Sequence, residues 1–76
     1  MTETEFMRQF GDNLTFVMKR SHMSQNELSK ATGINRTSIN RYVNGERIPP
    51  LKNVINMANV MNCDIDELID VDELIE

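Results

Sequence analysis

Apolar residues recur along this chain at the spacing of helices rather than strands. Phe6, Phe10, Leu14 and Val17 follow one another at intervals of four, four and three residues, which places them on one face of a first helix. A second set with helical spacing predicts another helix later in the chain: Leu51, Val54, Met57, Ala58 and Met61. No stretch alternates apolar and polar residues as a half-buried strand does, so every segment is expected to be helical.

Two capping boxes mark the starts of the first two helices. Thr2 with Glu5, and Ser24 with Glu27, each place a hydroxyl residue three positions before a glutamate. In a capping box, the hydroxyl and the carboxylate each accept a hydrogen bond from a backbone N–H that the helix leaves unpaired. The first helix should therefore begin near Thr2 and end near Ser21–His22, just before the second signal.

Glycine, asparagine and proline divide the middle of the chain. Gly33 is expected to end a short second helix in the left-handed conformation, and Gly45 to close the third. Asn35 is a good N-cap for this third helix. In the turn at residues 48–50, one proline is suited to the first position of the fourth helix. A further box, formed by residues 64–67, predicts a fifth.

Five helices joined by connections of about two to five residues predict a compact all-α fold. We expect one domain over residues 1–76, with its core at about residues 6–69 and an acidic C-terminal tail at residues 70–76, because so short a chain has no room for a second core. The sequence Asp-Glu-Leu-Ile occurs at residues 66–69 and again at 72–75. The second copy either extends the fifth helix or belongs to a frayed end.

The net charge of −4 conceals a division between the body and the tail. Residues 1–62 contain eight basic and five acidic residues, a net charge of +3, whereas residues 63–76 contain seven acidic residues and no basic one. The overall acidity is therefore no argument against nucleic acid as a partner of the body.

Several classes of protein are excluded by what the sequence lacks. The longest apolar runs are two or three residues, so we expect no transmembrane span or signal peptide and a cytoplasmic location. The single cysteine, Cys63, cannot form an internal disulfide and has no metal-ligand spacing around it. No nucleophile–base pair or phosphate-binding glycine loop is present. The protein is therefore expected not to be an enzyme and to use no cofactor, metal or small-molecule ligand.

The segment from Ser24 to Gly45 has the order helix, glycine-containing turn, helix, which is the helix-turn-helix arrangement. The second helix of such a unit can lie in the major groove of DNA. Here Ile39 and Val43 are expected on its inner face. Its outer face contains no acid and consists of hydrogen-bonding residues: Arg36, Thr37, Asn40, Arg41 and Asn44. Arginine can pair with guanine and asparagine with adenine, so this face suits base edges.

From about Phe10 to Ile69, the chain resembles the Cro/repressor family of helix-turn-helix proteins of phages and bacteria. The resemblance rests on residues that match in register without a gap: Leu14, Ser24, Gln25, Leu28, Gly33, Ile34, Ile39, Gly45, Pro49, Ala58, Met61, Asp66, Glu67 and Leu68. It covers roughly four fifths of the chain and implies a five-helix, lambda-repressor-like DNA-binding domain.

The resemblance also implies roles for individual residues. It implies base contacts for four residues of the third helix: Arg36, Thr37, Asn40 and Arg41. It implies contacts to backbone phosphate for five residues around that helix: Gln25, Asn35, Ser38, Asn44 and Arg47. Asn40 and Arg41 match positions that read either bases or flanking phosphate. The alternative for the arginines is ordinary solvated surface charge.

Two departures from the family pattern stand out. Many members have a buried arginine–glutamate pair at positions that correspond here to Met18 and Val43. Because both partners are apolar together, the pair is replaced rather than broken, and such a replacement is often neutral or stabilising. Ser29 and Thr32 stand where the family favours alanine and leucine. Ser29 is small enough for close helix packing and is expected to be tolerated.

These observations predict a transcriptional regulator, of the repressor type found in phages or mobile elements, that binds double-stranded DNA at an inverted repeat as a homodimer. Apolar residues of the acidic tail, among them Val71, Leu74 and Ile75, suggest a dimer contact there. Two alternatives remain, namely the antitoxin of a toxin pair and a protein-interaction module of the same fold.

Overall fold

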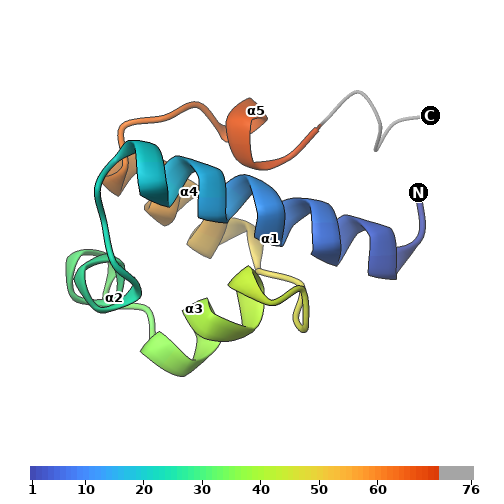
Figure 1. Ribbon diagram of the computed structural model, residues 1–76, viewed down its shortest axis with the longest axis horizontal. Coiled ribbons are helices and arrows are strands. Elements are labelled where there is room, and N and C mark those ends of the chain that lie inside the picture. The colour runs from blue at the N-terminus through green and yellow to red at the C-terminus, as the bar shows by residue number, and fades with distance from the viewer. Residues whose placement is uncertain (71–76) are drawn as a thin grey trace.

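Five helices form along residues 1–70, which are the residues that the computed structural model describes (Figure 1). In chain order they are α1 (Glu3–Arg20), α2 (Gln25–Thr32), α3 (Arg36–Val43), α4 (Leu51–Val60) and α5 (Ile65–Leu68). The long α1 crosses the middle of the molecule, with α2 and α3 below it, α5 above it and α4 behind it (Figure 1). The predicted all-α, five-helix fold is confirmed, and none of the described residues forms a strand.

The helix starts predicted from local signals are confirmed. The Thr2 side chain accepts a hydrogen bond from the Glu5 backbone N–H at 3.1 Å, and the Ser24 hydroxyl accepts one from the Glu27 N–H at 3.1 Å. In both boxes the glutamate carboxylate accepts from the cap residue's N–H in return. The Asn35 side chain accepts from the backbone N–H of Thr37 at 2.7 Å and so caps α3. These bonds satisfy backbone groups that would otherwise lack partners.

One detail of the prediction is wrong, and two further details of the helices could not be expected from the sequence. Pro50 is the N-cap of α4 rather than its first helical residue. Leu51, the first residue of α4, is 65% exposed and lies outside the core. Its spacing matches that of the buried residues of this helix, but spacing alone does not show whether another element covers a residue. The fifth helix is a single turn that ends at Leu68, since the next residue, Ile69, has extended backbone angles (φ −127°, ψ 128°). The second Asp-Glu-Leu-Ile copy, at 72–75, lies outside the described residues.

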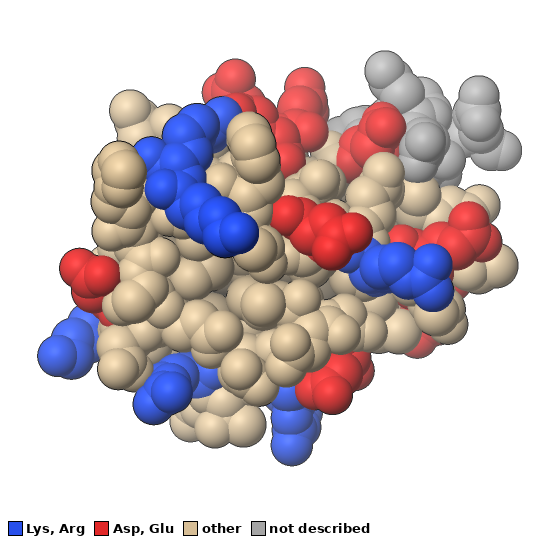
Figure 2. All heavy atoms as spheres, viewed as in Figure 1, with Lys and Arg blue, Asp and Glu red and all other residues tan. Residues whose placement is uncertain are grey.

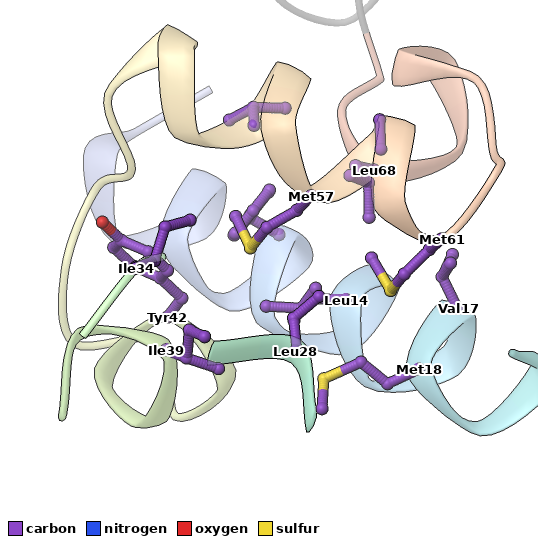
Figure 3. Packing of buried hydrophobic residues seen from close by; sticks show 13 residues of the cluster. Leu14, Val17, Met18, Leu28, Ile34, Ile39, Tyr42, Met57, Met61 and Leu68 are labelled. Atoms are coloured by element: carbon purple, nitrogen blue, oxygen red, sulfur yellow. The ribbon is translucent and has the colours of Figure 1, made fainter. Parts of the chain in front are cut away.

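The hydrophobic core draws on all five helices (Figure 3). Leu14 of α1, Leu28 of α2, Ile39 of α3, Met57 of α4 and Leu68 of α5 are each completely inaccessible to solvent. The ring of Tyr42 is also buried, and it packs edge-on against Phe10 of α1, with ring centroids 6.2 Å apart. α2 and α3 therefore have a fixed position relative to the rest of the molecule, because both contribute to the same core.

A glycine allows α1 to approach the end of α3 closely. A Cβ atom added at Gly11 would lie 2.6 Å from the carbonyl oxygen of Val43 and 2.8 Å from that of Tyr42. Gly11 is itself buried. Any side chain at this position would push against the α3 backbone, so the glycine sets how near the two helices come.

Polar contacts attach α5 to the opposite side of α1. The Asn13 side-chain amide donates a hydrogen bond to the Leu68 carbonyl at 3.0 Å, and Arg20 forms an ion pair with Glu67. The Arg20 guanidinium also lies 5.8 Å from the ring centroid of the exposed Phe16. α5, which carries the acidic residues Asp66 and Glu67, is thus held away from α3.

Candidate nucleic-acid interface

The turn between α2 and α3 is closed by side-chain hydrogen bonds. The Ser29 hydroxyl donates to the Ile34 carbonyl at 2.6 Å. The Thr32 hydroxyl donates to the Leu28 carbonyl at 2.7 Å and accepts from the Ile34 N–H at 3.1 Å. Gly33 adopts the left-handed conformation that the sequence predicts, with φ at 77°. Ser29 and Thr32, the two departures from the family pattern in α2, are therefore more than tolerated: they stabilise this turn.

α3 has one buried and one exposed face. Ile39 and Tyr42 are buried against the core, and Val43 is half-buried beside it. The four residues predicted to contact bases are all exposed: Arg36, Thr37, Asn40 and Arg41. No residue of α3 is acidic. The helix thus presents only neutral donors and acceptors and positive charge to the solvent.

The structure brings most of the predicted site residues together. Arg36, Thr37 and Asn40 line one shallow hollow on the exposed face. The Asn40 amide donates to the Gln25 side-chain carbonyl at 3.3 Å, and the Asn44 amide donates to the Asn40 carbonyl at 3.2 Å. Asn40, predicted to contact a base, is therefore hydrogen-bonded to two residues predicted to contact phosphate.

The remaining predicted residues lie around this group. Arg47 donates to the Ser38 hydroxyl at 3.4 Å, which links the loop after α3 to its first turn. Asn35 and Ser38 line a second hollow, between the α2–α3 turn and the start of α4. Arg41 is exposed one turn after Thr37 and lines neither hollow. Eight of the nine residues thus make contacts within the face or line its hollows.

Two asparagines of α4 that the sequence analysis did not single out connect this helix to the helix-turn-helix unit. The Asn53 amide donates to the Tyr42 hydroxyl at 3.0 Å, and the Asn56 amide donates to the Thr32 carbonyl at 2.8 Å. Lys52, next to Asn53, lines the same hollow as Asn35 and Ser38. Asparagine is a poor helix former, so two of them three residues apart in a helix were a usable signal.

Met18 and Val43, the apolar substitutes for the family's ion pair, meet in the structure. Met18 is buried and Val43 is half-buried, and both line a small hollow beside Gln25. The expectation that the ion pair is replaced as a unit agrees with this packing.

The charges are distributed unevenly between the two sides of the molecule. In Figure 2, acidic side chains gather along the upper edge, over α5, beside a basic group at the upper left, whereas the lower edge, over α2 and α3, carries basic side chains with few acidic ones. Residues 24–47 contain four basic and two acidic residues, and residues 63–70 contain four acidic residues and no basic one. Of the two acids near α3, Glu27 accepts hydrogen bonds at the start of α2, and these bonds from Ser24 lower its pKa. The side of α3 is the one suited to a polyanion.

Outside this face, the described residues offer little reactive chemistry. Burial raises the pKa of the half-buried Cys63 thiol, which keeps it protonated and unreactive. Among residues 1–70, no cluster of three or more His, Cys, Asp or Glu side chains could hold a metal ion. The helices in this part of the chain are all too short or too polar to cross a membrane. The exposed face of α3 is the best candidate for a functional surface.

Comparison with known proteins agrees with this geometry. The model of the helix-turn-helix family HTH_3 matches residues 17–68. A curated relative, the uncharacterized HTH-type transcriptional regulator YqaE of Bacillus subtilis (strain 168), is 30% identical over 60 residues, which are 79% of this chain and 52% of the relative. The chain thus spans about half the length of this relative.

Two solved structures are similar in fold. An HTH_3 family transcriptional regulator from Vibrio cholerae matches with a TM-score of 0.84 and 18% identity, over 97% of this chain and 42% of that chain. The restriction-modification controller protein C.AhdI from Aeromonas hydrophila matches with a TM-score of 0.78 and 24% identity, over 83% of this chain and 96% of that chain. At these identities the likeness shows the fold alone, and it agrees with the five-helix arrangement described above.

Proposed function

The chain belongs to the helix-turn-helix family HTH_3 of transcriptional regulators, and on this premise we propose that it binds double-stranded DNA with α3 in the major groove. Proteins of this family are regulators and not enzymes, as expected for this chain. The observation that carries the proposal is the exposed face of α3, which offers donors, acceptors and positive charge but no carboxylate. A helix in the major groove needs such a face, because a carboxylate would be repelled by the phosphates on both sides.

The residues divide into two groups by their position on this face. We assign base contacts to the exposed residues of α3: Arg36, Thr37, Asn40 and Arg41. We assign phosphate contacts to the residues that surround the helix: Gln25, Asn35, Ser38, Asn44 and Arg47. Base contacts carry sequence information, whereas phosphate contacts fix the position of the protein on the duplex.

We further propose that the protein acts as a repressor of phage or mobile-element type, in the cytoplasm, and as a homodimer on an inverted repeat. α3 has eight residues and is about 12 Å long, so it can read only a few base pairs. Two copies related by a two-fold axis would read two half-sites about one helical turn apart. The restriction-modification controller protein C.AhdI has a similar fold, and the match covers 96% of its chain.

A binding titration tests the proposal. Duplexes enriched by the wild-type protein from a random library at low salt serve as the specific probe, and a scrambled duplex of equal length serves as the non-specific one. Binding to both should weaken steeply as salt rises, because phosphate contacts release counterions. If no duplex is enriched and none binds at low salt, DNA binding is refuted, and the antitoxin or interaction-module reading takes its place.

A pair of charge-matched variants tests the docking orientation. Arg36→Ala should lower affinity for the enriched duplex by roughly 5- to 150-fold, the value of one bidentate base contact, and lower affinity for the scrambled duplex much less. Arg20→Ala removes the same charge beside Glu67 of α5 and should leave the ratio of the two affinities unchanged. Equal effects of the two variants on this ratio would contradict the orientation.

A further inference from the structure

The side of α1 that faces the solvent carries an aromatic ring that takes no part in the core. Phe16 is 64% exposed, and it is the one exposed aromatic residue among residues 1–70. Arg20 lies beside it, with the guanidinium 5.8 Å from the ring centroid, and pairs with Glu67 of α5. Aromatic residues are enriched at protein interfaces, so Phe16 marks a surface suited to a protein partner.

Charges of opposite sign flank Phe16 along this helix. Asp12 is exposed about one turn before Phe16, and Lys19 is exposed about one turn after it. Residues three or four apart lie on the same side of a helix, so the three side chains form one row. This row of Asp12, Phe16 and Lys19 is the α1 outer face. Along it, an acid, an aromatic ring and a base follow in that order.

A surface with this order is complementary to a second copy of itself. When two α1 helices lie antiparallel with their Phe16 rings in contact, each Asp12 is opposite Lys19 of the other copy. In a parallel pair, Asp12 would instead be opposite Asp12, and Lys19 opposite Lys19. Opposite charges across an interface favour one orientation, and like charges oppose the other. A two-fold dimer requires a self-complementary surface of this kind, because both copies use the same residues.

The position of the α1 outer face also suits two copies on one duplex. α4 lies behind α1, with α3 below it and α5 above it, so this face points toward the viewer in Figure 1. A two-fold axis that runs from α5 to α3, vertically in this view, makes two facing α1 helices antiparallel. The same axis leaves both α3 helices on one side of the dimer and both α5 helices on the other. Both exposed faces of α3 are then available to the same DNA.

We propose that the α1 outer face is the contact between two copies of this chain. The inference rests on the proposed function, which requires two copies for two half-sites. α5 ends beside this face, because the Asn13 amide donates to the carbonyl of Leu68, the last residue of α5, at 3.0 Å. The chain therefore enters its acidic tail next to the α1 outer face, and the two can contribute to one contact.

The contact is expected to be weak in the absence of DNA. α1 has 18 residues and is about 27 Å long, so a single pair of these helices forms a small interface. Two half-sites on one duplex hold the copies close together and raise their effective concentration. The protein should therefore dimerise at high concentration when free, and at much lower concentration on DNA.

Phe16→Trp gives a direct probe of the contact, because the chain contains no tryptophan. The indole ring keeps the aromatic contact and loses water as two copies associate. Its fluorescence should therefore shift to shorter wavelength as the protein concentration rises to about 1 mM, where weak association becomes visible. Sedimentation equilibrium of the wild-type protein over the same range, without DNA, should give the dissociation constant of the dimer.

Two serine variants compare the α1 outer face with another exposed apolar position. Leu51 of α4 is 65% exposed, so Leu51→Ser is a matched control for Phe16→Ser. Phe16→Ser takes two rings out of the dimer and should raise its dissociation constant by at least about tenfold. Leu51→Ser should change it by less than about twofold. Thermal unfolding followed by circular dichroism checks that both variants fold.

Charge reversal tests the antiparallel arrangement. Asp12→Lys alone and Lys19→Glu alone each place like charges opposite one another. Each should weaken the dimer by about 2- to 30-fold at low salt, because every dimer contains two such pairs. The double variant again has opposite charges at the two positions, so it should associate about as strongly as the wild-type protein. Such a rescue requires that residues 12 and 19 of different copies lie opposite each other.

A wild-type protein that stays monomeric at about 1 mM, with a Phe16→Trp emission that does not change, would overturn the inference. So would a Phe16→Ser variant that weakens association no more than Leu51→Ser, or a double charge variant that associates no better than the single ones. None of these measurements contains DNA. Failure of the wild-type protein to enrich any duplex would therefore refute the proposed function separately from this contact.

Discussion

Substitution of Gly11 tests how far the position of α3 depends on its contact with α1. A Cβ in Gly11→Ala would lie 2.6 Å from the Val43 carbonyl oxygen and 2.8 Å from that of Tyr42. Both oxygens belong to the backbone at the end of α3, so neither can rotate away as a flexible side chain would. The two helices must therefore move apart, and the core between them must loosen.

The expected loss of stability follows from two opposing contributions. Alanine is favoured over glycine in a helix by up to about 1 kcal/mol. Overpacking of a well-packed interior costs about 1–3 kcal/mol, and a clash with backbone belongs in the upper half of that range. We therefore expect a net destabilisation of about 1–2 kcal/mol, which lowers the Tm of a domain of this size by roughly 4–16 °C.

Thermal unfolding of the wild-type protein, Gly11→Ala and a control variant, all followed by circular dichroism, measures this loss. Asp12→Ala is the control, because Asp12 is the exposed neighbour on the same helix. The control should unfold close to the wild-type temperature or slightly above it. If Gly11→Ala is as stable as Asp12→Ala, the helices adjust at no cost and the close approach does not fix α3.

Two further predictions concern the acidic groups. Hydrogen bonds lower the folded-state pKa of Glu27 (from Ser24) and of Glu67 (from Arg20). Both carboxylates therefore stabilise the fold at pH values above 4.5, the ordinary pKa of glutamate. This stabilisation is lost as the pH falls from 4.5 through the lowered pKa of each group. Unfolding by urea at pH 7 and pH 3 should show that loss, and Glu27→Gln, which keeps an acceptor for the cap, should show a smaller one; an equal loss would exclude Glu27 as a cause. Deletion of residues 71–76, which lie outside the described residues, should leave a folded helical protein that self-associates more weakly, measured by sedimentation against the full chain. A truncated form that associates equally well would place the dimer contact elsewhere.

Features that depend on neighbouring residues were predictable from the sequence. The capping boxes at Thr2 and Ser24 need only a glutamate three residues later, and the left-handed turn at Gly33 needs only a residue without a Cβ. The stripe of apolar residues on α1 likewise follows from local spacing. The presence and order of the helices and the exposed face of α3 could therefore be predicted from the sequence.

Features that depend on the distance between helices were not predictable in this way. The contact of Gly11 with α3 and the hydrogen bond from the Asn40 side chain to the Gln25 side chain arise only once the helices have packed. Leu51 illustrates the same limit, because its spacing fits the buried stripe of α4 although no neighbour covers it. Ser29 and Thr32 are a different case. Their hydrogen bonds are local, but the sequence analysis compared the two residues with those common in the family and did not consider the bonds that they form.

The division of α3 into a buried and an exposed face has a consequence for how such a regulator can evolve. Ile39 and Tyr42 maintain the fold, whereas Arg36, Thr37 and Arg41 are exposed and take no part in the core. Substitutions at exposed positions usually change stability by less than about 0.5 kcal/mol. New operator preferences can therefore be sampled at these three positions by mutations that are nearly neutral for folding. After gene duplication, two copies could come to control different genes while the scaffold beneath the recognition surface stays the same.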